Sequence, residues 1–306
     1  MPLAVRTAGR LMKDVEFRCL GMTFGVDGTS VCSLAGSRSS ASQGDRTQSM
    51  KCVILAGGRG SRIGEESLVK PKPMIEIGAK PILWHIMKIY SHYGIDEFVI
   101  CLGYLGYIIK EYFANYSFHQ SDVTIDLSND QIVNHGRASE PWRVTLVDTG
   151  DQTATGGRVL RVRDYLDSNE PFLLTYGDGV ADVDIASAVA FHASHGRLAT
   201  MTVVRPPARF GSVRIAGDRI VDFEEKPNTS EGLINGGFFV MSPKVLDLIE
   251  GDNAALEAAP LELLAAKDEL RAWRHEGFWQ PMDTQRDKEL LQSMWEAGVA
   301  PWKVWS

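Results

Sequence analysis

The chain has 306 residues, of which 44% are hydrophobic and 23% are charged, and its formal net charge is −7. This length and composition are typical of one large α/β domain or of two small domains. No apolar run reaches about 18 residues, which argues against a membrane-spanning helix, and a globally acidic chain is a poor candidate for nucleic-acid binding. The cysteines have neither CxxC nor zinc-type spacing and predict reduced thiols in a cytoplasmic protein: Cys19, Cys32, Cys52 and Cys101.

Residues 1–49 differ in composition from the rest of the chain. Residues 28–48 are mostly Ser, Gly, Thr and Ala, and their low hydrophobicity and lack of period predict disorder. A secretory signal is disfavoured because charged residues interrupt any apolar core. An organellar transit peptide stays open as an alternative, although acidic residues count against it. Because Met50 directly precedes the first strong strand, we interpret residues 1–49 as a disordered extension or a mis-annotated start, and residues 50–306 as one compact domain.

From Met50 onward, short apolar strands alternate with helices. This alternation favours a mostly parallel sheet that is covered by helices on both faces. The expected strands are 52–55, 98–102, 144–147, 172–175 and 200–204, and the expected helices are 81–93, 108–116, 157–166 and 184–195.

The last third of the chain is more mixed. A small added hairpin is expected, and we assign the remaining segments to a substrate-facing half of the same domain because no internal repeat is visible. In the last helix, Leu290, Leu291 and Met294 are expected to face inward. The expected elements are hairpin strands at 212–215 and 219–224, a strand at 237–241, and helices at 243–249, 260–267 and 283–297.

Three glycines follow the first strand. Gly57, Gly58 and Gly60 would let main-chain N–H groups approach a phosphate closely. The dinucleotide pattern GxGxxG fails because position 63 is Ile63, and a Walker loop fails because Ser61 and not Lys follows Gly60. A plain glycine turn is the alternative interpretation.

Positive charge beside these glycines favours a polyanionic ligand. Arg62, Lys70 and Lys72 follow within a short distance, and Pro71 and Pro73 alternate with the lysines. Proline fixes φ and disfavours helix in the residue before it. We therefore expect a stiff, extended segment that aims an ammonium group at a fixed point.

Two aspartates are candidate metal ligands. Asp178 ends an apolar strand between Gly177 and Gly179, and ligands of open α/β sheets sit at the carboxyl ends of strands. Mg²⁺ takes oxygen ligands and usually also binds substrate phosphates. Asp283 follows an aromatic run at the start of an expected helix. A turn or N-cap role is the alternative for Asp178, and N-capping is the alternative for Asp283.

Three further motifs carry little information alone. The sequence EEKP at 224–227 is by itself a solvated charge run, and NGG at 235–237 is by itself a turn. His192 and His195 lie three residues apart on an expected helix, and without a third ligand in view they are expected at the surface or the helix end.

The order of these motifs is more specific than any one of them. AGGRGSR, KPKPM, YGDG, EEKP, NGG and MDT occur in the order that is typical of the sugar-1-phosphate nucleotidylyltransferases, which residues 50–306 resemble and residues 1–49 do not. The stretches EPWRVTLVDTGDQTATGGR, FWQPMDTQRDKELL and APWKVW resemble the branch that transfers cytidylyl groups to glucose 1-phosphate. The resemblance implies a Rossmann-like nucleotide-diphospho-sugar transferase fold, with a mixed, mostly parallel central sheet flanked by helices.

The resemblance also implies a reaction. CTP and α-D-glucose 1-phosphate would give CDP-glucose and pyrophosphate by direct in-line attack of the sugar phosphate, with Mg²⁺ as cofactor, and the product would serve surface polysaccharide such as O-antigen. It implies a homo-oligomer, and the charge and hydropathy predict neither a nucleic-acid nor a membrane partner. The terminal aromatic segment 301–305 is a candidate contact between copies, and packing on its own domain is the alternative. A uridylyl- or thymidylyltransferase of the same fold and a non-catalytic nucleotide-sugar-binding subunit remain alternatives.

The resemblance assigns roles to residues of this chain. Arg62 would hold the departing phosphates, Lys72 would lie between the reacting phosphates, and Asp178 and Asp283 would hold the metal ion. Base choice is expected in the stretch 149–158 and the glycine loop. The implied nucleotide contacts are Leu55, Ala56, Gly57, Gly58, Gly60, Ser61, Arg62, Thr149 and Gly156, and the implied sugar-phosphate contacts are Lys72, Gly177, Glu225, Lys226, Asn235 and Gly236.

Overall fold

The computed structural model describes residues 50–58, 60, 63, 66–136, 140–206, 212–216, 219–224 and 232–306, with the segments 212–216 and 219–224 described by their backbone alone. The predicted extension 1–49 lies outside the described residues. None of the helices in the described part of the chain is long and apolar enough to cross a membrane.

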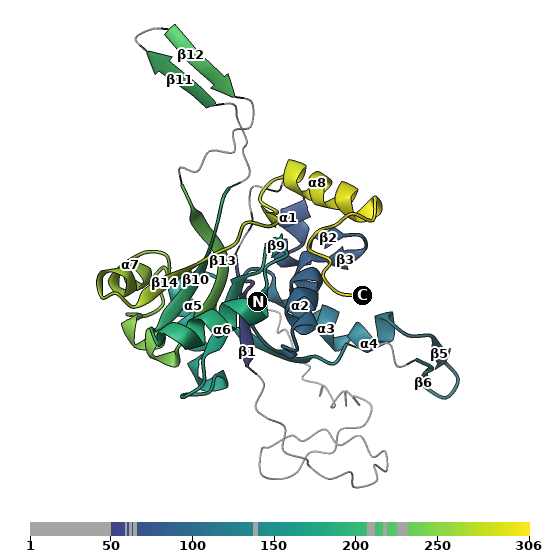
Figure 1. Cartoon of the computed structure of the whole chain (residues 1–306). Helices are drawn as coiled ribbons and strands as arrows, with labels where there is room; N and C mark the ends of the chain where they lie inside the picture. The colour runs from purple at the N-terminus through teal and green to yellow at the C-terminus, as the bar shows by residue number, and fades with distance from the viewer. Residues whose placement is uncertain are drawn as a thin grey trace, which may run out of the picture. The chain divides into compact units, whose positions relative to one another are not determined.

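A seven-stranded sheet organises the fold, in the order β14–β10–β13–β8–β1–β4–β7 (Figure 1). All neighbouring pairs are parallel except the two that involve β13. This confirms the predicted mixed, mostly parallel sheet. The strands are β1 (Lys51–Leu55), β4 (Glu97–Leu102), β7 (Arg143–Asp148), β8 (Phe172–Tyr176), β10 (Ala199–Val204), β13 (Ile234–Met241) and β14 (Leu270–Arg274).

Side chains of each central strand alternate between two apolar cores. In β1, Cys52 and Ile54 point into one core, and Val53 and Leu55 point into the other. A strand that is buried on both faces must be apolar throughout, which explains the continuous apolar run of β1. The first core includes side chains of α2 (Ile82–His92), α3 (Gly106–Ala114), α6 (Ile185–His195) and α8 (Gln285–Glu296), and the second includes side chains of α5 (Thr155–Arg161), the 3₁₀ helix η3 (Pro243–Leu248) and α7 (Ala259–Ala266).

Four two-stranded ladders and several short turns complete the described part of the chain. The predicted hairpin is confirmed as β11 with β12. Figure 1 shows α8 beside β2 and β3, where Gln292 Oε1 accepts a hydrogen bond from the N–H of Gly78 at 2.9 Å. The ladders are β2 (Glu76–Ile77) with β3 (Lys80–Pro81), β5 (Val123–Asp126) with β6 (Gln131–Asn134), β9 (Gly179–Ala181) with β15 (Trp279–Pro281), and β11 (Ser212–Ala216) with β12 (Arg219–Glu224). The short helices are α1 (Glu66–Val69), η1 (Lys72–Met74), α4 (Tyr116–His119) and η2 (Arg163–Tyr165).

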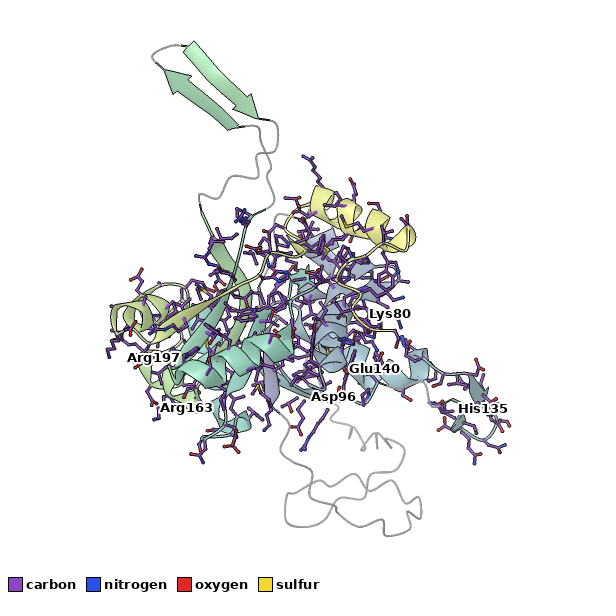
Figure 2. All side chains as sticks on the ribbon, in the orientation of Figure 1. Lys80, Asp96, His135, Glu140, Arg163 and Arg197 are labelled. Atoms are coloured by element: carbon purple, nitrogen blue, oxygen red, sulfur yellow. The ribbon has the colours of Figure 1, made fainter. Side chains whose placement is uncertain are left out.

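Cationic and aromatic side chains gather around Trp84 of α2. Lys80 and Lys88 each lie with Nζ 5.7 Å from the centre of the Trp84 ring, and Lys88 donates to Glu140 at 3.0 Å. Lys80 and Glu140 are labelled in Figure 2. Trp84 also meets Trp305 edge to face, and this contact fastens Trp305 to α2.

Two details of the helices differ from the predictions. Leu290 is 40% exposed, so the prediction that it faces inward is wrong, whereas Leu291 is fully buried. His192 was expected at the surface or the helix end but is buried within α6, and its Nδ1 lies 2.9 Å from Thr200 Oγ1. His192 therefore forms a hydrogen bond with the hydroxyl of Thr200 in β10 inside the protein. The spacing of His192 and His195 alone did not reveal this partner.

The terminal aromatic segment packs on its own domain through Trp302. This side chain is fully buried, stacks on Phe278 and Trp295, and donates from Nε1 to Nδ1 of His85 at 3.4 Å. Trp302 therefore packs on its own domain, whereas a contact of the remaining residues of the segment 301–305 with another copy stays a prediction.

Candidate active site

A three-residue ladder brings the two candidate metal ligands together. In the antiparallel pair β9–β15, Gly179 faces Pro281, and the N–H of Met282 donates to the carbonyl of Asp178 at 2.8 Å. The residue after Met282 is Asp283, two residues beyond the end of β15. Two carboxylates that are far apart in the sequence therefore lie side by side at the carboxyl end of β8.

The helix start behind Asp283 fixes its position. The N-cap of α8 is Thr284, which forms a capping box with Asp287, and Asp287 Oδ2 also accepts from the N–H of Asp283 at 3.1 Å. The capping alternative for Asp283 is therefore wrong. With the capping role taken by its neighbour, the Asp283 carboxylate is directed elsewhere.

Both carboxylates contact Lys72. Its Nζ lies 2.7 Å from Asp178 Oδ2 and 2.6 Å from Asp283 Oδ1, while the Lys72 side chain is largely buried and each carboxylate is about a third exposed. Burial alone would lower the pKa of Lys72, but the charges and hydrogen bonds of the two aspartates outweigh it and hold the pKa above the ordinary value for lysine. Lys72 is therefore a charged ammonium group at neutral pH.

The segment around Lys72 is stiff but is not extended as predicted. Pro71 has an extended conformation, and the chain then turns into η1, where the N–H of Met74 donates to the Pro71 carbonyl at 2.8 Å and that of Ile75 to the Lys72 carbonyl at 3.1 Å. Pro73 occupies an early position of this 3₁₀ turn, where a missing N–H costs nothing. The turn buries the stem of Lys72 and leaves its ammonium group at the carboxylates.

A cavity of about 530 Å³ opens in front of Lys72. Its walls are the glycine loop after β1, the end of β8, and the segment 151–155 with Arg158. Eight predicted site residues line it: Leu55, Gly57, Gly58, Gly60, Lys72, Gly177, Asp178 and Asp283.

Gly60 has a clear structural reason to be glycine. Its φ of +61° lies in the left-handed region, and a Cβ there would lie 2.7 Å from Cβ of Lys72. The glycine loop therefore passes directly over the stem of the lysine. Ser61 and Arg62, which were predicted to bind nucleotide, lie outside the described residues.

A smaller cavity of about 40 Å³ adjoins the first one. It shares Tyr176 and Asp178 with the larger cavity and contains the predicted sugar contacts Asn235 and Gly236. Trp279 Nε1 donates to the Gly236 carbonyl at 2.7 Å, which ties this wall to β15. The other predicted sugar contacts, Glu225 and Lys226, lie outside the described residues.

Three predicted nucleotide contacts lie behind the cavity wall. Ala56 and Thr149 are buried, and Thr149 Oγ1 donates to the Leu102 carbonyl at 2.6 Å. Gly156 packs against the segment after η3, where a Cβ would lie 2.6 Å from the Ala254 carbonyl oxygen. In this structure these residues support the wall and do not line it.

Arg158 also lines the cavity, although the sequence predicted no role for it beyond its place at the end of the stretch 149–158. Its guanidinium is buried, donates from Nη1 to Thr149 Oγ1 at 2.8 Å, and donates from Nη2 to the carbonyls of Gly57 and Asp151 at 3.2 and 3.3 Å. It therefore joins the glycine loop to the segment 151–155. Val162, the C-cap of α5, is buried, and residues four apart lie on the same face of a helix. The spacing of Arg158 from this apolar residue could therefore have placed Arg158 on the inner face of α5.

The two aspartates suit a divalent cation. No group of three or more His, Cys, Asp or Glu side chains within the described residues could hold a metal ion by itself. Mg²⁺ characteristically binds one or two carboxylates and completes its shell with water and substrate phosphates. Asp178 and Asp283 are partly exposed at a cavity and meet this requirement as a pair.

Comparison with known proteins places the chain in a family. Residues 51–280 match the family model described as nucleotidyl transferase. The chain belongs to the nucleotidyl transferase family. A glucose-1-phosphate cytidylyltransferase of Salmonella typhimurium is 57% identical over 256 residues, which cover 84% of this chain and 100% of that protein. A probable glucose-1-phosphate cytidylyltransferase of Bacillus subtilis is 44% identical over 257 residues, with the same coverage.

Solved structures of lower identity share the fold. The crystal structure of HddC from Yersinia pseudotuberculosis superposes with a TM-score of 0.57 at 22% identity, and covers 80% of this chain and 99% of its own. UDP-glucose pyrophosphorylase from Acinetobacter baumanii gives a TM-score of 0.60 at 17% identity, with 82% and 96% covered. These likenesses confirm the predicted nucleotidyltransferase fold.

Proposed function

We propose that this protein transfers the cytidylyl group of CTP to α-D-glucose 1-phosphate, giving CDP-glucose and pyrophosphate. The 57% identity to a glucose-1-phosphate cytidylyltransferase over that protein's whole length supports the substrates. The structural observation that carries the proposal is the charged Lys72, held between Asp178 and Asp283 at the wall of a cavity of substrate size.

The reaction is a direct displacement at phosphorus. An oxygen of the sugar phosphate attacks the α-phosphorus of CTP, the new P–O bond forms, and the bond to the bridging oxygen of pyrophosphate breaks. No covalent enzyme intermediate is needed, so catalysis consists of alignment and of stabilising negative charge. Lys72 supplies the positive charge beside the reacting phosphates.

Asp178 and Asp283 hold the metal ion in this proposal. The family generally uses a divalent metal, and we propose Mg²⁺ because both ligands are carboxylate oxygens. When bound, it neutralises phosphate charge. The protein's own contribution is to keep the two carboxylates adjacent through the β9–β15 ladder.

The remaining predicted contacts divide between the two substrates. Gly57, Gly58 and Gly60 face the cavity and would hold the triphosphate through their N–H groups, together with Ser61 and Arg62. The wall formed by residues 151–155 would meet the base. Gly177 in the larger cavity and Asn235 and Gly236 in the smaller one would meet the sugar phosphate. Glu225 and Lys226 are proposed to contact it as well.

Pyrophosphate release from each NTP separately tests the proposal. Protein, Mg²⁺ and glucose 1-phosphate are mixed with CTP, UTP, dTTP, ATP or GTP, and CTP is expected to be turned over fastest. Faster turnover of UTP or dTTP would refute the cytidylyl assignment and favour the alternative nucleotide. Binding of CTP without release of pyrophosphate would favour a non-catalytic binding subunit.

We further propose that the protein is a homo-oligomer. The β5–β6 hairpin exposes Ile125 at 51%, Leu127 at 90% and Ile132 at 62%, and Ile125 pairs directly with Ile132, so these two side chains share a face. A two-stranded hairpin is marginal in water by itself, and an exposed apolar patch is typical of an interface. Light scattering is expected to show an oligomer that Ile125→Lys dissociates; a wild-type monomer would contradict this. The cytoplasmic location and the role in surface polysaccharide stay predictions.

A further inference from the structure

A chain of hydrogen bonds joins two walls of the cavity through Glu257. The Tyr176 hydroxyl donates to Glu257 Oε1 at 2.5 Å, and Thr155 Oγ1 donates to Glu257 Oε2 at 2.5 Å. The Tyr176 oxygen in turn accepts from Asn235 Nδ2 at 3.3 Å, and Thr155 Oγ1 accepts from the N–H of Leu256 at 2.9 Å. Both hydroxyl protons therefore point toward one carboxylate.

The partners of Glu257 belong to different walls. Thr155 begins α5 and ends the segment 151–155. Tyr176 ends β8, two residues before Asp178, and borders both cavities. Glu257 itself does not line either cavity. Any influence on bound substrates must therefore pass through Thr155 and Tyr176.

Glu257 is held by a segment that packs closely on α5. The N–H of Ala154 donates to the Asp252 carbonyl at 2.8 Å, and that of Gly157 donates to the Ala254 carbonyl at 3.1 Å. A Cβ on Gly157 would lie 2.5 Å from the Asp252 carbonyl oxygen. The two glycines of α5 therefore allow the segment 252–257 to lie against the helix, which anchors Glu257 next to Thr155.

The chemistry of this chain requires a carboxylate. A hydroxyl has one proton to donate, and here each hydroxyl already accepts a bond from a nitrogen. Glutamate accepts at two oxygens without donating, whereas the amide of glutamine would present N–H groups to one of the two hydroxyls. Bonds to an ionised acceptor are also shorter and stronger than neutral ones.

We propose that Glu257 is a positioning residue, which sets the separation between Thr155 on the nucleotide side and Tyr176 with Asn235 on the sugar side. The inference rests on the function proposed above. In-line attack needs both substrates aligned, and a displacement of about 1 Å can cost on the order of 100-fold in rate. Loss of the bridge is therefore expected to lower kcat more than it raises either KM.

The first test is steady-state kinetics of Glu257→Gln, with Glu262→Gln as the matched control. Glu262 is an exposed glutamate in the first turn of α7. We expect Glu257→Gln to lower kcat about tenfold with each KM changed less than about threefold, and the control to match wild type. Equal kcat in the two variants would overturn the proposal.

Partner variants separate a bridge from a general loss of stability. Tyr176→Phe removes the hydroxyl, and adding Glu257→Gln to it is expected to cost little more, because either change alone interrupts the bridge between Thr155 and Tyr176. Thr155→Ser, which keeps a hydroxyl, is expected to retain more activity than Thr155→Val. Additive losses in the double variant would contradict the proposal.

Hydrogen exchange gives a readout that does not depend on turnover. Amides of residues 151–157 and 176–178 are expected to exchange faster in Glu257→Gln than in Glu262→Gln. Unchanged exchange would overturn the bridge even in an active enzyme. If wild type releases no pyrophosphate from any NTP, the proposed function fails, and the exchange comparison still decides whether Glu257 couples the two walls.

Discussion

Replacing Lys72 by methionine keeps the length of the side chain and removes its charge. The ammonium group lies within 2.7 Å of both carboxylates and lines the cavity, where we propose that it acts on the reacting phosphates. Removing one preorganised group that stabilises transition-state charge typically costs on the order of 10²–10³ in kcat, or about 3–4 kcal/mol. We expect a loss of this size in pyrophosphate release with CTP and glucose 1-phosphate.

Stability is expected to change much less than activity. Because each carboxylate is about a third exposed, water screens the ion pairs, and their loss is expected to cost about 1 kcal/mol in the free energy of unfolding. Lys88→Met is the matched control. Lys88 Nζ lies 3.0 Å from Glu140 in an ion pair, and neither residue lines the cavity. A kcat for Lys72→Met within about tenfold of wild type would refute the role assigned to Lys72.

Three further predictions follow from the geometry of the site and core. Gly60→Ala places a Cβ 2.7 Å from that of Lys72 at a φ of +61°, so it is expected to lower kcat/KM at least tenfold and stability by about 1–2 kcal/mol; wild-type kinetics would contradict this. Chelation of divalent metal should abolish pyrophosphate release, Mg²⁺ should restore it, and Asp283→Asn should raise the Mg²⁺ concentration needed for half activity; a metal-independent rate would rule out the ligand role. Burial lowers the pKa of His85 to about 4, so between pH 6.5 and 4 the unfolded chain binds a proton that the folded protein does not. The free energy of unfolding is therefore expected to be highest above pH 6.5 and to fall by up to about 3 kcal/mol toward pH 4. In denaturant titrations, the free energy of unfolding of His85→Gln should fall less steeply between pH 6.5 and 4 than that of wild type. An unchanged pH dependence would exclude His85 as the cause.

The parallel core of the fold could be predicted from the sequence because burial on both faces leaves a simple pattern. Strands such as β1 and β8 have nearly continuous apolar runs, and both were expected within one residue of their observed bounds. The edge strand β14 was missed because Leu270–Arg274 contains two arginines among five residues and has no fully buried residue. A short edge strand without an apolar run can be recognised only from the strand with which it pairs, which is β10 for β14.

The candidate site was harder to predict because its decisive contacts are not local. Asp178 and Asp283 meet through β9 and β15, which have three residues each and no measurable period. From residue pattern alone, either aspartate could have been a cap or a turn residue. Their pairing came from resemblance to a family, and the ladder supplies its physical reason.

The charges of the cavity wall explain why a divalent cation belongs in the reaction. The described lining residues include two cationic side chains, Lys72 and Arg158, and three carboxylates, Asp151, Asp178 and Asp283. Arg158 already donates to main-chain carbonyls, and Lys72 contacts two carboxylates. A triphosphate and a sugar phosphate would therefore enter a cavity whose described lining has no excess of positive charge. A divalent ion at Asp178 and Asp283 would neutralise these carboxylates and free Lys72 to act on the phosphates, so metal and lysine are expected to depend on one another.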